Sequence, residues 1–119
     1  MSPEKAKVFI AEDDEDYQKY ARKILEGAGH TVVATATTLP EALKIVAKLE
    51  ELGINVAAID GNLRPNSVGG YDGQTILKAI KEQAPNVKTV GISSLKIPGA
   101  DANAGKLHMD KLGEIVRNL

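Results

Sequence analysis

The sequence lacks three features, and each absence excludes a class of protein. None of the 119 residues is cysteine, so no disulfide, thiolate nucleophile or thiolate metal site can form. Neither charge is in excess: 15 Lys and Arg face 16 Asp and Glu, and a net charge of −1 argues against a nucleic acid or a membrane surface as the main partner. No apolar run approaches the length of a membrane span, and residues 1–7 have no apolar stretch behind them that could serve as a signal peptide. We therefore expect a cytoplasmic protein that binds neither nucleic acid nor membrane.

The sequence does contain short apolar runs that alternate with helical patterns. β-type runs occur at 7–11, 30–36, 54–59 and 87–93, and apolar residues at helical spacing occur at 17–28, 38–53, 76–84 and 112–119. Thr38, with Glu41 three residues later, predicts a capped start for the second helix. Strands that alternate with helices predict βαβ units, that is, an α/β fold with a parallel sheet covered on both faces. The length fits a single domain over residues 1–119.

Side chains suited to chemistry follow the predicted strands at their carboxyl ends. In order along the chain they are Glu12, Asp13, Asp60, Ser93 and Lys106. In a parallel sheet these ends meet at one edge, where α/β proteins bind their ligands. Three carboxylates there would repel one another unless a cation lay among them, and oxygen ligands alone favour Mg²⁺ over zinc. A lysine and a hydroxyl at the same edge offer a charge and a hydrogen-bond donor to a phosphoryl group, which a carboxylate beside a divalent cation can accept.

Four stretches of the chain resemble the signature blocks of a known family, the response-regulator receiver domains or CheY-like proteins. In order, these stretches are "VFIAEDDED" (8–16), "VAAIDGNL" (56–63), "VKTVGISS" (87–94) and "GADANAGKL" (99–107). Together they extend over essentially the whole chain. The resemblance implies a single receiver domain with a flavodoxin-like, doubly wound sheet of five parallel strands in the order 2-1-3-4-5.

The resemblance also implies a phosphoacceptor and a metal site. Asp60 would take a phosphoryl group from a phosphohistidine on a histidine kinase or a histidine phosphotransfer protein. Asp13 and Asp60 would hold Mg²⁺ or Mn²⁺, and Glu12 would assist through a water molecule. Asn62 would contribute its backbone carbonyl to the metal.

Two further residues would contact the phosphoryl group itself. Ser93 would donate its hydroxyl, and Lys106 would pair with the phosphoryl oxygens. Such a protein would act as a relay, a phosphate sink or a switch that docks a downstream protein or a second copy of itself. Only self-catalysed phosphotransfer and autodephosphorylation are implied, so we do not expect an enzyme.

The chain departs from the family between Ser94 and Lys106. The roughly eight residues before the fifth strand would span only about 12 Å as a helix, whereas a return along five residues of strand needs about 17 Å. We therefore expect the family's fourth helix to be shortened or absent, with an extended segment in its place. Asn103 stands where the family has an aromatic switch residue, so we do not expect hydroxyl–aromatic coupling to carry the signal.

Each feature also has an ordinary explanation. Acids at 12–16 suit the start of a helix, and Asp60 suits a turn because glycine follows it. His30 and His108 fit no metal spacing and are predicted to be structural or exposed. A pseudo-receiver, which keeps the fold and binds a partner without being phosphorylated, is therefore an alternative. A hydrolase with an aspartyl-phosphate intermediate is a weaker one, because Asn62 stands where that chemistry has a second aspartate.

Overall fold

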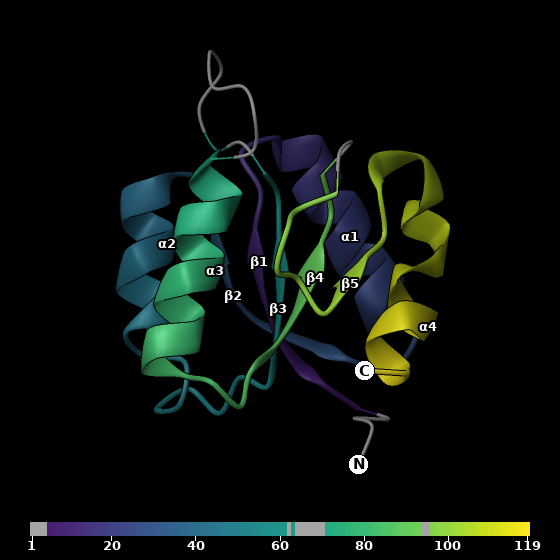
Figure 1. The fold of residues 1–119 in the computed structure, drawn as a ribbon. Helices are drawn as coiled ribbons and strands as arrows, with labels where there is room; N and C mark the ends of the chain where they lie inside the picture. The colour runs from purple at the N-terminus through teal and green to yellow at the C-terminus, as the bar shows by residue number, and fades with distance from the viewer. Residues whose placement is uncertain (1–4, 62, 64–70, 94–95) are drawn as a thin grey trace.

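Five parallel strands form one sheet in the order β2-β1-β3-β4-β5, which confirms the predicted topology (Figure 1). The computed structural model describes residues 5–61, 63, 71–93 and 96–119, apart from the side chains of 106–108. The strands are β1 (Lys7–Ala11), β2 (Thr31–Ala36), β3 (Val56–Ile59), β4 (Lys88–Gly91) and β5 (Ala102–Asn103). The helices are α1 (Glu15–Gly27), α2 (Leu39–Val46), α3 (Tyr71–Gln83), a 3₁₀ helix η1 (Lys106–Lys111) and α4 (Leu112–Arg117).

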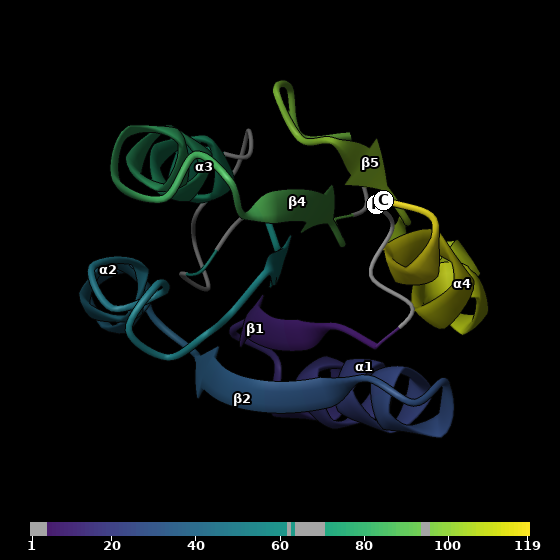
Figure 2. The same ribbon diagram turned by 90° about the horizontal axis from the view of Figure 1, so that it is seen from below.

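Helices cover both faces of the sheet, α2 and α3 on one side and α1 and α4 on the other (Figure 2). In β1, Phe9 and Ala11 pack toward the first pair of helices, while Val8 and Ile10 pack toward the second. All four residues of β3 are buried. Successive side chains of a strand point to opposite faces, so a strand covered on both faces is an unbroken apolar run in the sequence. This confirms the doubly wound fold.

Side-chain caps fix the starts of α1 and α2. Asp14 Oδ1 accepts hydrogen bonds from the amides of Asp16 at 2.9 Å and Tyr17 at 3.2 Å. Thr38 Oγ1 accepts from the amide of Glu41 at 3.3 Å, as the sequence predicted. Each cap satisfies amides that have no partner inside the helix.

Two other helix boundaries differ from the prediction. α2 ends at Val46, before its predicted end, because the amide of Lys48 donates to a carbonyl three residues back at 2.8 Å and tightens the chain into turns. α3 begins at Tyr71, earlier than predicted. The prediction missed its first turn because the residues buried there, Asp72 and Gly73, are not apolar. Apolar spacing therefore marks only the later part of α3.

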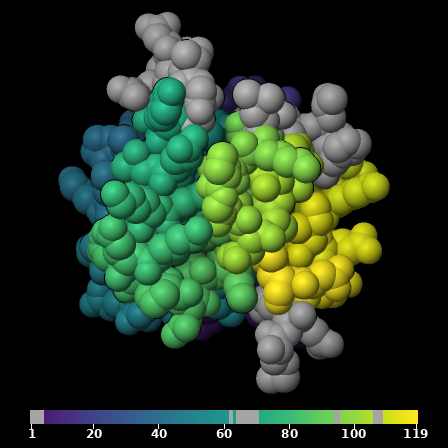
Figure 3. Space-filling model, viewed as in Figure 1, coloured from purple at the N-terminus to yellow at the C-terminus, as the bar shows by residue number. Residues whose placement is uncertain are grey.

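The crossover segment, residues 96–103, contains no helix. The predicted loss of the family's fourth helix is thus confirmed for these residues. Asn103 Oδ1 accepts from the amide of Ile97 at 2.9 Å, and Asp101 Oδ2 accepts from the amide of Thr89 at 2.8 Å. Ile97 is buried in the core on the α2 and α3 side. On the face seen in Figure 3, the segment fills the surface between α3 and the C-terminal helices.

His30 joins the first strand to the C-terminal helix. It is buried, its Nδ1 lies 2.9 Å from the amide nitrogen of Ala6, and its Nε2 lies 3.0 Å from the carbonyl oxygen of Gly113. Because an amide can only donate and a carbonyl can only accept, Nε2 carries the proton. The structural role predicted for His30 is confirmed, whereas the side chain of His108 lies outside the described residues. Within the described ranges, no helix is both long and apolar enough to cross a bilayer.

Candidate functional site

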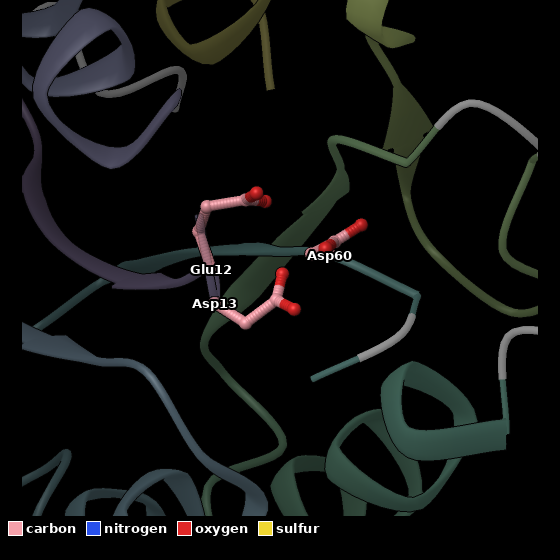
Figure 4. Close-up of side chains that lie close together, drawn as sticks. All are labelled: Glu12, Asp13 and Asp60. Carbon is pink, nitrogen blue, oxygen red and sulfur yellow. The ribbon is translucent and has the colours of Figure 1, made fainter. Parts of the chain in front are cut away.

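Three acids converge at the carboxyl edge of the sheet. Glu12 and Asp13 directly follow β1, and Asp60 directly follows β3. These strands are parallel neighbours with Ala11 opposite Ile59, so both reach the same edge. One carboxylate oxygen from each acid lies within 4.8 Å of one from each of the others, and the three carboxylates lie close together (Figure 4). The convergence predicted from the sequence is confirmed.

The sheet holds these acids firmly. The amide of Asp60 donates to the Ala11 carbonyl at 2.8 Å, and the amide of Glu12 donates to the Ala36 carbonyl at 3.0 Å, so both extend the β-ladder. Glu12 is fully buried and Asp60 is 5% exposed, while Asp13 is half-buried. Like charges brought this close repel one another, and a bound cation would offset that repulsion.

The donor set fits Mg²⁺. The three side chains of Glu12, Asp13 and Asp60 offer carboxylate oxygens only, which are the hard ligands that Mg²⁺ and Mn²⁺ prefer. The greater exposure of Asp13 leaves one side of the cluster open to water, and Mg²⁺ keeps several water ligands in most protein sites. These residues can therefore hold a small divalent cation.

Ser93 lies just beyond the end of β4, at the same edge. β4 pairs with β3 with Gly91 opposite Ile59, and the Ser93 residue is 8% exposed. The backbone of Lys106 begins η1, and Ala104 and Gly105 separate it from the end of β5. The Lys106 side chain and the whole of Asn62 lie outside the described residues, so their places in the site stay predictions.

The first turn of α3 makes contacts beside the site that the sequence did not predict. Asp72 is 2% exposed, and its Oδ2 accepts from the amide of Leu63 at 3.0 Å. The amide of Gly73 donates to the carbonyl of Gly61 at 2.8 Å. The chain that leaves Asp60 is therefore bonded to α3 at two points. The sequence signal is weak, because an acid near a helix start is common to many helices.

Comparison with known proteins identifies the chain's relatives. The model of the family described as "Response regulator receiver domain" matches residues 8–111. No curated protein sequence matches. Similar solved structures include the isolated receiver domain of RcsB from Salmonella enterica serovar Typhimurium in the presence of phosphomimetic BeF3⁻, with 21% identity, a TM-score of 0.73, and coverage of 92% of this chain and 84% of that one.

Two further structures show the same arrangement. The signal receiver domain of NarL from Mycobacterium tuberculosis is 18% identical, with a TM-score of 0.70 and coverage of 98% of each chain. The response regulator domain of CheB from Thermotoga maritima is 22% identical, with a TM-score of 0.67 and coverage of 96% of this chain and 90% of that one. At these identities the likeness shows the shared fold.

Proposed function

The chain belongs to the response-regulator receiver domain family, and from this premise we propose that it accepts a phosphoryl group on Asp60. The donor is a phosphohistidine on a histidine kinase or a histidine phosphotransfer protein. The phosphorylated protein then acts as a relay, a phosphate sink or a switch that docks a partner. A cytoplasmic location belongs to the same proposal.

In the proposed transfer, a carboxylate oxygen of Asp60 attacks the phosphorus atom in line with the leaving group. A P–O bond forms while the P–N bond to the donor imidazole breaks, and the electron pair of that bond stays on the imidazole nitrogen. Water later attacks the phosphorus of the aspartyl phosphate, which releases phosphate and restores the carboxylate. Both steps are self-catalysed on the receiver, so we do not propose that it is an enzyme.

Other residues of the edge would support this reaction. Glu12, Asp13 and Asp60 would hold Mg²⁺ or Mn²⁺, which when bound supplies positive charge opposite the phosphoryl oxygens. The hydroxyl of Ser93 would donate to one phosphoryl oxygen, and the ammonium group of Lys106 would pair with another.

The convergence of the three carboxylates is the observation that carries the proposal. They come from the ends of two adjacent strands, and the oxygen of Asp60 that accepts from the amide of Gly61 at 2.8 Å has a fixed orientation. A nucleophile that is already oriented before the phosphoryl donor binds loses less conformational entropy on the way to the transition state.

Incubation with acetyl phosphate and Mg²⁺, followed by intact mass spectrometry, tests the proposal. We expect the wild type to gain the mass of one phosphoryl group and Asp60→Asn to gain none. Asp14→Asn is the matched control, because it removes a neighbouring exposed acid and keeps an equally good helix cap, so it should react like the wild type. A wild type that gains no mass would instead favour the pseudo-receiver, a binding module without phosphorylation.

A further inference from the structure

We propose that Asp72 is a positioning residue for Asp60 and acts through the residues that follow the phosphoacceptor. This inference rests on the proposed function. Asp72 lies in α3, outside the acidic cluster, and is one of the few buried charged side chains in the described part of the chain. A buried carboxylate is costly unless hydrogen bonds compensate for the lost water, so its contacts indicate what it does.

The first contact joins Asp72 to the chain downstream of Asp60. Asp72 Oδ2 accepts from the amide of Leu63 at 3.0 Å in a buried environment. A hydrogen bond to an ionised acceptor is stronger than one between neutral groups. Asp72 is also the second residue of α3, where the helix dipole favours a negative charge. The carboxylate thus fixes the backbone at Leu63, which is itself buried.

The second contact brings the backbone of α3 against that of the phosphoacceptor. The amide of Gly73 donates to the carbonyl of Gly61 at 2.8 Å. A Cβ atom added at Gly73 would lie 2.9 Å from the carbonyl oxygen of Asp60 and 2.9 Å from Cα of Gly61. Only glycine allows this approach, so the start of α3 lies directly on the backbone of residues 60 and 61.

These contacts reach the reactive carboxylate through Gly61. The amide of Gly61 donates to Asp60 Oδ1 at 2.8 Å, while its carbonyl accepts from Gly73. One residue therefore couples the orientation of the Asp60 side chain to the position of α3. Asp72 holds the other end of the same short stretch at Leu63. Because misplacement of a reacting group by about 1 Å can cost about 100-fold in rate, loss of this hold should slow the transfer.

A purely structural role for Asp72 makes a different prediction. Asp16 is also the second residue of its helix, α1, and it is exposed. If Asp72 only favours the start of a helix, its removal would lower stability and leave the reaction of the folded protein unchanged. If it positions Asp60, removal would slow the reaction even at saturating acetyl phosphate and Mg²⁺.

The test compares Asp72→Ala with Asp72→Asn, which keeps an oxygen that can accept from Leu63. Asp101→Ala is the stability control, because it removes another carboxylate that accepts from a backbone amide, that of Thr89, at the β5 edge of the sheet. The amide region of the nuclear magnetic resonance spectrum first shows that each variant is folded. Intact mass spectrometry then measures the rate of phosphorylation as a function of acetyl phosphate concentration. We expect the maximal rate to fall about tenfold or more in Asp72→Ala and to stay within about threefold of wild type in the other two.

Amide exchange supplies a second readout that needs no phosphoryl donor. In Asp72→Ala the Leu63 amide should exchange about tenfold or more faster than in wild type, and in Asp72→Asn its protection should return. A wild-type rate of phosphorylation in folded Asp72→Ala overturns the positioning role and leaves the proposed function intact. A wild type that is never phosphorylated overturns the proposed function, and the positioning role is overturned with it.

Discussion

The centre of the sheet and its β5 edge are stabilised by different interactions. In the centre, β1 and β3 are covered by helices on both faces, and residues such as Ile10 and Ile59 are completely buried. At the edge, β5 has only two residues, and Asp101 and Asn103 hold the crossover segment to its neighbours by hydrogen bonds. Where no helix lies over this crossover, hydrogen bonds between side chains and backbone supplement the apolar packing of Ile97. The acids of the candidate site lie in the centre.

The largest difference should appear when a central side chain is truncated. Ile10→Ala removes a fully buried side chain between β1 and the α1 and α4 layer, and should lower the free energy of unfolding by about 3 kcal/mol. Urea unfolding measures this loss. If Ile10→Ala lowered the free energy of unfolding no more than the variants at the β5 edge do, apolar burial would not distinguish the centre of the sheet from its edge.

A smaller loss is expected at Gly91, where β4 meets the crossover segment. A Cβ atom there would collide with Asn103 Oδ1, so Gly91→Ala should cost about 2 kcal/mol by displacing the side chain that holds Ile97. Asn103→Ala alone should cost about 1 kcal/mol. In the Asn103→Ala background, Gly91→Ala should cost much less, because the colliding atom is gone. Additive losses in this double-mutant cycle would argue against the contact.

Asp101→Ala should lower stability by about as much as Asn103→Ala, and by less than Ile10→Ala or Gly91→Ala. Asp101 Oδ2 accepts from the amide and the hydroxyl of Thr89, and the Asp101 amide donates to that hydroxyl at 3.1 Å. The side chain is on the surface, so we expect a loss of about 1 kcal/mol. Asp110→Ala, which removes another exposed aspartate nearby in sequence, should change stability by less than about 0.5 kcal/mol. Equal effects of the two variants would show that the tether contributes nothing.

Binding of beryllofluoride should distinguish the two regions without any mutation. Asn103 is not aromatic, and its side chain accepts a hydrogen bond from the amide of Ile97. We therefore do not expect it to act as the family's aromatic switch does, and the chemical-shift changes should not be limited to the β5 edge. In the presence of Mg²⁺, we expect amide shifts at residues 12, 13, 60 and 63 and along the start of α3. Nuclear magnetic resonance spectra recorded with and without beryllofluoride measure these shifts. Large shifts found only in residues 96–119 would indicate that the signal passes through the β5 edge.

The sequence predicts the centre better than the edge for a physical reason. β1 and β3 appear as unbroken apolar runs because both their faces are buried, and parallel strands necessarily bring Glu12, Asp13 and Asp60 to one edge. The contacts of Asp72 and Asn103 depend on how the chain crosses between strands, and no local pattern encodes them. The missing crossover helix was predicted from the family resemblance together with the length of the segment, which is too short to return as a helix.

A Mg²⁺ titration followed by isothermal calorimetry and amide shifts tests most directly whether the clustered acids form one cation site. We predict a single site in the wild type, with shifts centred on residues 12, 13 and 60, and affinity reduced about tenfold or more by Asp13→Asn. Asp14→Asn, adjacent in sequence and outside the cluster, should bind as wild type does. Absence of binding, or equal affinity in Asp13→Asn and wild type, would contradict a metal site built from these three carboxylates.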